Sequence, residues 1–150
     1  RRVLFRSLVA PIAHAQEPRG PRRIAMQTVA DLRAWDATVD RMNRSGDLRI
    51  RQHRIDPLLA SRTHDRLDQY YRGVRVFGGD VARQLEGGVT TSIFGTVYEG
   101  ITIDPTPSFS TADARAIVMQ LSGAELPETY APELLVLPRD AGLAADAPPF

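Results

Sequence analysis

Arg62–Gly79 reads Arg-Thr-His-Asp-Arg-Leu-Asp-Gln-Tyr-Tyr-Arg-Gly-Val-Arg-Val-Phe-Gly-Gly, and this stretch decides the fold. Two runs in it, His64–Tyr71 and Val74–Phe77, are rich in aromatic and β-branched side chains, which suit a pleated and half-buried surface. Gly73 allows a positive φ in the turn between them, and the pair Gly78-Gly79 allows a bulge or a close backbone approach. No side chain in the stretch has obvious catalytic chemistry, which favours a structural or binding role.

An amphipathic helix precedes this stretch. Thr28, with Asp31 three residues later, fits an N-cap, and Gly46 fits a left-handed C-terminal cap. Between them apolar residues recur at spacings of three and four, as one face of a helix requires. The stripe consists of Val29, Leu32, Trp35, Val39 and Met42. We expect this stripe, and Trp35 in particular, to pack on a sheet.

Further strands are expected on both sides of the central stretch. Leu48–Arg54 alternates apolar Leu48 and Ile50 with arginines, while Asp80–Glu86 and Val89–Val97 are joined by a Gly-Gly turn. The second of these strands should place Val89, Thr91, Ile93, Gly95 and Val97 on one face. Leu67 and one of Val76 and Phe77 should face the helix. The sequence therefore predicts an α+β fold in which one helix packs on an antiparallel sheet of about four strands.

A partial second α+β unit is expected after a proline-bearing break at residues 99–108. Ser110–Asp113 resembles a capping box, and a helix should run from Thr111 to Leu121 and end at Gly123. Glu133–Pro138 reads as a short strand without partner strands, so we expect fast amide exchange beyond about Pro127. Residues 139–150 are rich in Ala and Pro and are predicted to be a disordered tail.

The central stretch resembles the core motif of the fungalysin/thermolysin propeptide (FTP) domain. That motif runs His-x-Arg-[Leu/Phe]-x-Gln-x-x-x-Gly-Val-x-Val-x-Gly-Gly, and Arg75 departs from the proline that is common at its position. The residues in register are His64, Arg66, Leu67, Gln69, Gly73, Val74, Val76, Gly78 and Gly79. By resemblance the fold is cystatin-like, and residues 99–138 resemble the opening of the PepSY domain that follows FTP.

The expected organisation follows from these observations. Residues 1–15 are predicted to be a signal-peptide remnant with an A-x-A cleavage site at Ala13-His14-Ala15, and residues 16–27 a linker. Residues 28–98 form the expected FTP domain, and residues 99–138 the partial PepSY-like region. The resemblance implies a secreted or periplasmic protein.

The resemblance also implies a function. Such prosegments assist the folding of a thermolysin-like zinc protease domain attached in cis and inhibit it until they are cleaved away. Zinc would belong to that protease domain, which these 150 residues do not contain; no cofactor is expected in this chain. The alternative is a stand-alone secreted protein-binding or inhibitor module of the same fold.

The inventory of reactive residues favours a non-catalytic chain. Its three histidines, His14, His53 and His64, form no His-Glu-x-x-His motif, and there is no cysteine. Carboxylate pairs such as Asp65 and Asp68 are expected to be solvated. A net charge of +1 argues against nucleic acid as a partner, and no apolar run is long enough to cross a membrane.

A partner-binding surface is expected on the exposed sheet face and edge around the central hairpin, where an aromatic side chain could anchor a protein partner. The candidate residues are Gln69, Tyr70, Tyr71, Val74 and Phe77.

Overall fold

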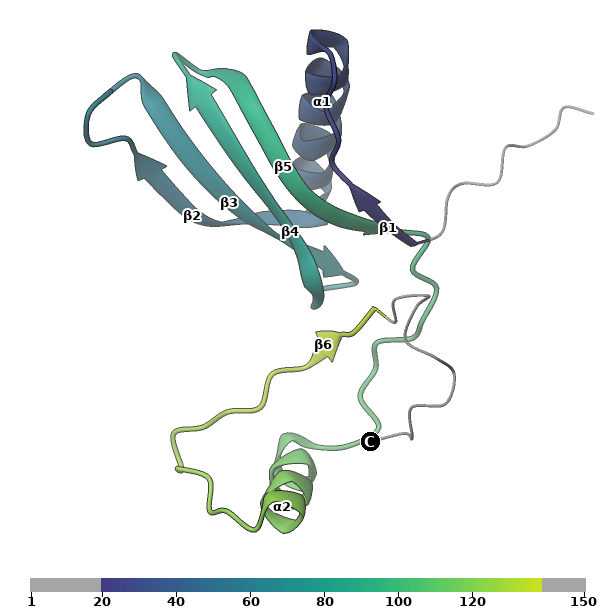
Figure 1. Ribbon diagram of the computed structural model, residues 1–150. Helices are drawn as coiled ribbons and strands as arrows, with labels where there is room; N and C mark the ends of the chain where they lie inside the picture. The colour runs from purple at the N-terminus through teal and green to yellow at the C-terminus, as the bar shows by residue number, and fades with distance from the viewer. Residues whose placement is uncertain (1–19, 139–150) are drawn as a thin grey trace, which may run out of the picture.

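The computed structural model describes residues 20–138, so the predicted signal-peptide remnant and tail lie outside the described residues. The described chain is α+β, with two helices and a six-stranded sheet (Figure 1). The elements in chain order are β1 (Gly20–Arg23), α1 (Val29–Ser45), β2 (Leu48–Ile55), β3 (Arg62–Tyr71), β4 (Val74–Glu86), β5 (Val89–Glu99), α2 (Thr111–Ser122) and β6 (Leu135–Val136).

The sheet is larger than the four strands expected. Its strands lie in the order β1-β5-β4-β3-β2, all antiparallel to their neighbours, and β6 adds to β4 in parallel. The two additional strands are β1 and β6, whereas two of the expected strands are merged into one. Residues 20–23, expected within a linker, pair with β5 as β1. The expected strands Val74–Phe77 and Asp80–Glu86 are one continuous β4, because Gly78-Gly79 forms part of a bulge and does not end the strand.

Helix α1 begins and ends where the sequence predicted. The side chain of Thr28 accepts the amide of Asp31, the Asp31 carboxylate accepts the amide of Thr28, and Gly46 ends the helix at φ +83°. The helix covers one face of the sheet. The core cluster between them comprises Trp35, Val39, Leu48, Leu67, Val81, Ile93 and Val97, with Leu32 and Met42 packed against it. Val29 is exposed, so the predicted stripe reaches the core only from Leu32 onward.

Two bulges overturn the simple alternation expected in the outer strands. In β2, Arg51 is an extra residue between pairs with β3, and only Leu48 is buried; Ile50 is 47% exposed although it lies opposite the buried Leu67. In β5, Thr91 is the extra residue. That insertion turns Thr90 toward α1 and leaves Val89 and Thr91 exposed, contrary to expectation.

The segment after β5 also differs from the prediction. Helix α2 has the expected capping box of Ser110 and Asp113 and ends at Gly123, but it buries none of its residues. The strand expected to lack partners is paired. Leu135 and Val136 lie beside Arg75 and Val76 of β4, and Val136 is buried. The premise that this strand lacks a partner is therefore wrong, because β4 supplies one; the expected fast exchange stays a prediction.

Of the two candidates for the inward position on β4, Val76 is buried and Phe77 is 54% exposed. Leu67, on the neighbouring strand, is completely buried in the core cluster. We therefore expect Leu67→Ala to lower the free energy of unfolding by about 2–5 kcal/mol through lost burial and a residual cavity. Phe77→Ala should cost less than about 1 kcal/mol.

Urea unfolding followed by the fluorescence of Trp35, the single tryptophan, compares the two variants. Equal losses of stability in Leu67→Ala and Phe77→Ala would contradict this placement of the core.

Candidate functional site

The β3–β4 hairpin carries the residues expected to bind a partner, and the structure divides them into two kinds. Tyr70, Tyr71 and Val74 are half-buried and Phe77 is exposed. Arg72 and Gly73 form a two-residue turn with φ values of +48° and +85°, the pattern of a type I′ hairpin. Gln69 is buried, so of the five candidate residues it is the one that the structure does not place at the surface.

The amide of Gln69 is used inside the sheet. Its Nε2 donates to the backbone carbonyl of Tyr98 at 2.7 Å, and its Oε1 accepts from the backbone N–H of Tyr98 at 2.8 Å. The β4–β5 pairing ends at Asp80 and Thr96, so β4 does not pair with Tyr98. The Gln69 side chain thus completes hydrogen bonds that the bulged strand leaves open.

The bulge in β4 makes room for this contact. Four residues, 76–79, lie opposite the single residue Gln69 of β3. A Cβ at Gly79 would lie 2.7 Å from Gln69 Oε1 and 2.8 Å from Gln69 Cβ, closer than such atoms can approach. Gly79 is therefore required because the glutamine side chain passes over it.

The other residues of the motif also have places in the fold. His64 Nε2 lies 3.3 Å from Asp56, and Arg66 lies over the ring of Phe94. Contacts with the amides of Leu58 and Leu59 and with His64 hold the pKa of Asp56 below its usual value. Every residue that carries the motif therefore serves a turn, the bulge, the core or a surface contact.

Residues 46–97 match the family model of the Fungalysin/Thermolysin Propeptide Motif. The matched FTP segment starts at the cap of α1 and takes in β2, β3, β4 and most of β5. It is shorter than the predicted 28–98 and covers less than half of the chain. Comparison with curated proteins and with solved structures gives no match. The cystatin-like arrangement and the PepSY-like character of residues 99–138 stay predictions.

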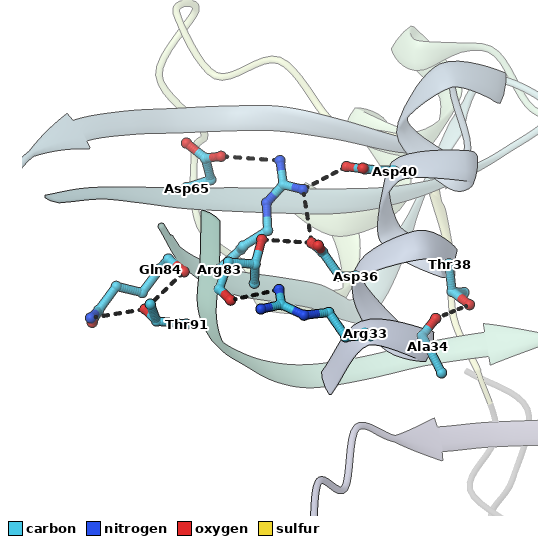
Figure 2. A network of polar contacts seen from close by, with 10 residues as sticks. Arg33, Ala34, Asp36, Thr38, Asp40, Asp65, Arg83, Gln84 and Thr91 are labelled. Carbon is cyan, nitrogen blue, oxygen red and sulfur yellow. Dashed lines mark hydrogen bonds and ion pairs between the residues drawn. The ribbon is translucent and has the colours of Figure 1, made fainter. Parts of the chain in front are cut away.

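A partly buried ion network ties the FTP segment to α1 (Figure 2). Arg83 of β4 reaches Asp40 of α1 at 2.6 Å, Asp65 of β3 at 3.3 Å and Asp36 of α1 at 3.6 Å. Asp36 also accepts a 2.6 Å hydrogen bond from Thr90. Burial alone would lower the pKa of Arg83, but the contacts with Asp40 and Asp65 outweigh it and raise the pKa.

This network corrects the expectation that Asp65 and Asp68 are solvated. Asp65 is buried between Arg83 and His53, whose Nδ1 lies 2.6 Å from its carboxylate. Asp68 is buried and faces Arg51 at 3.2 Å. Sequence alone gave no signal for the network, because its members come from α1, β2, β3 and β4.

No group of three or more residues that could hold a metal ion occurs among residues 20–138. Both described histidines have carboxylate neighbours, His53 with Asp65 and His64 with Asp56. His14 lies outside the described residues. Within the same range no helix is long and apolar enough to span a membrane.

The edge of β4 next to the hairpin is covered by β6 and fixed by an ion pair. Arg75 donates twice to the carboxylate of Glu133, at 2.7 and 2.8 Å. This bidentate contact raises the pKa of Arg75 and lowers that of Glu133. Beside β6 lies a groove of about 410 Å³. Its lining is mainly apolar and comes from Val74, residues 103–111, Ala114 and residues 132–136.

We expect Gln69→Met to lower the free energy of unfolding by about 1–3 kcal/mol, because the N–H and C=O of Tyr98 lose their partners. Gln84→Met is the matched control, since the Gln84 amide contacts only Thr91 at 3.4 Å near the surface. Urea unfolding measures both. A Gln69→Met variant as stable as Gln84→Met would contradict the role of Gln69.

Removing the Arg83 cation from the ion network should lower the free energy of unfolding more than Gln69→Met does. Arg83→Met removes the cation shared by Asp36, Asp40 and Asp65, and we expect a loss of about 2–4 kcal/mol, less than for a fully buried pair because Asp40 is nearly half exposed. Arg41→Met, on the exposed surface of α1, is the control. Adding Asp65→Asn to Arg83→Met should recover part of the stability; a further loss in the double variant would refute the network as the cause.

Proposed function

We propose that this chain is the propeptide region of a secreted, thermolysin-like zinc metallopeptidase precursor and acts as intramolecular chaperone and inhibitor of the protease domain. The observation that carries the proposal is the match of residues 46–97 to the FTP motif. FTP propeptides belong to secreted proteases, which supports an extracellular or periplasmic location. The zinc that such a protease uses would be held by the protease domain.

The structure supports action by surface contact. The motif residues serve the fold, and the hairpin presents Tyr70, Tyr71, Val74 and Phe77 at or near the surface. Arg49 lies 4.0 Å from the ring centre of Tyr70, and Arg72 lies 5.3 Å from that of Tyr71. These stacked pairs offer aromatic and cationic groups to a protein partner. A module that binds only the folded protease stabilises it by mass action and blocks its cleft.

We further propose that residues 99–138 belong to a PepSY-like unit. Helix α2 has an apolar stripe of Ile117, Val118 and Leu121, and all three side chains are exposed. A helix of this length gains most of its stability from packing an apolar face. We infer that further strands of the same unit cover this stripe in a complete precursor.

The alternative is a stand-alone secreted binding or inhibitor module of the same fold. The match of the FTP segment alone, without α1 or residues 99–138, leaves that alternative open. The reading frame beyond Phe150 separates the two proposals, because the precursor requires a His-Glu-x-x-His domain there.

The functional test is inhibition in trans. The purified chain is titrated into the mature protease encoded in its own reading frame, with hydrolysis of a peptide substrate as the readout. We expect a Kd of about 1 μM, near −8 kcal/mol, and a higher refolding yield of the denatured protease.

Phe77→Ser in the chain should weaken the inhibition, and Arg41→Ser on the outer surface of α1 should not. Absence of both inhibition and refolding benefit at about a hundred times that Kd would refute the prosegment function. It would favour the stand-alone module.

A further inference from the structure

The first half of β4 has an edge that its neighbour β5 does not use. Pairing between β4 and β5 stops at Asp80 and Thr96. The next backbone N–H and C=O of β5 that face β4 belong to Tyr98, and both are hydrogen-bonded to the side-chain amide of Gln69. The backbone of β4 at Arg75 and Val76 is therefore open on that side to another strand. Residues 135–136 fill the position as β6 (Figure 1).

Three kinds of contact hold the strand that occupies this edge and determine which sequence fits there. The backbone pairs in parallel, Leu135 with Arg75 and Val136 with Val76. The guanidinium of Arg75 binds the Glu133 carboxylate through two hydrogen bonds. Val136, three residues after Glu133, is buried, as is its partner Val76, whereas Leu134 and Leu137 are exposed. A carboxylate followed three residues later by a β-branched aliphatic side chain is thus the pattern that the edge accepts.

The present occupant is held by a small contact. Only two residues pair, and the chain on both sides of them has no regular secondary structure. Helix α2, which precedes this segment, buries none of its residues. Elements with so few buried contacts open locally at a low free-energy cost.

We propose that the edge of β4 at Arg75 and Val76 is a binding site for extended acidic peptides of the pattern Glu-x-x-Val, and that residues 133–137 are its displaceable internal occupant. The ligand adds as a parallel strand, with affinity from main-chain hydrogen bonds and selectivity from Arg75 and the buried valine position. This inference goes beyond the proposed propeptide function and does not depend on it.

The internal occupant sets the apparent affinity. A tethered segment competes at an effective concentration of about 1 mM or more, so a free peptide binds the closed chain weakly. Opening the site removes that competition and raises the apparent affinity by the inverse of the open fraction.

The test uses the full chain and a labelled peptide of residues 131–138, Ala-Pro-Glu-Leu-Leu-Val-Leu-Pro. Val136→Asp in the chain releases β6, and Val118→Asp on the exposed surface of α2 is the matched control. Fluorescence anisotropy should show at least about tenfold tighter peptide binding to Val136→Asp than to the wild type or the control.

The charge pair gives a second, specific readout. A peptide with Arg in place of Glu133 should bind the Val136→Asp chain about three- to tenfold more weakly. Adding Arg75→Glu to that chain should restore binding of the Arg-containing peptide. If Arg75→Glu did not reverse the preference between the Glu-containing and the Arg-containing peptide, Arg75 would not contact the peptide carboxylate.

Equal binding to the open and closed chains, or none to a folded Val136→Asp chain at about 1 mM peptide, would overturn the proposal. Folding is checked by circular dichroism. Should the variant unfold, hydrogen exchange on the wild type decides: excess peptide must remove protection from the amides of residues 135–137 while the β3–β4 amides stay protected. Unchanged protection at residues 135–137 would overturn the proposal in that case.

Discussion

The side-chain amide of Gln69 takes the place of a strand at the point where β4 bulges away from β5. It donates to the backbone C=O of Tyr98 and accepts from the backbone N–H of the same residue, as a neighbouring strand would. The contact requires the four-residue bulge of β4 and the absence of a side chain at Gly79. The first half of β4 is left unpaired with β5, and β6 occupies that edge.

The helix is joined to the sheet by two different kinds of contact. Apolar side chains of α1 pack on the sheet around Trp35 and Val39, and this burial supplies the non-directional part of the stability. Arg83 then links two carboxylates of α1 to one of β3. Because a buried charge is costly without its partners, loss of Arg83 would leave the carboxylate of Asp65 uncompensated.

The residues of the FTP motif have structural roles in this fold. The FTP motif supplies a bulge, a turn and a core, so the segment that matches the family model is a scaffold. What a scaffold of this kind can do is present surfaces: the hairpin with its stacked tyrosines, and the edge of β4. The inhibitor and folding aid proposed above needs nothing more, because both effects would arise from binding the folded protease.

The sequence by itself determined the local structure. The caps of both helices, the hairpin turn at Gly73 and the existence of strands in the central stretch follow from short-range rules, and Trp35 and Leu67 are in the core as predicted. Together with the motif, these features led to the FTP resemblance, which the family model bears out over residues 46–97.

Only the tertiary structure decided the rest, because it depends on residues far apart in the chain. A bulge changes which face a side chain occupies, so the positions of Val89 and Phe77 could not be read from alternation alone. Gln69 was predicted to contact a partner because its bond to Tyr98, 29 residues away, is invisible in the sequence. The burial of Asp65 and the pairing of β6 have the same cause: their partners, Arg83 and Val76, are brought to them by the folded sheet.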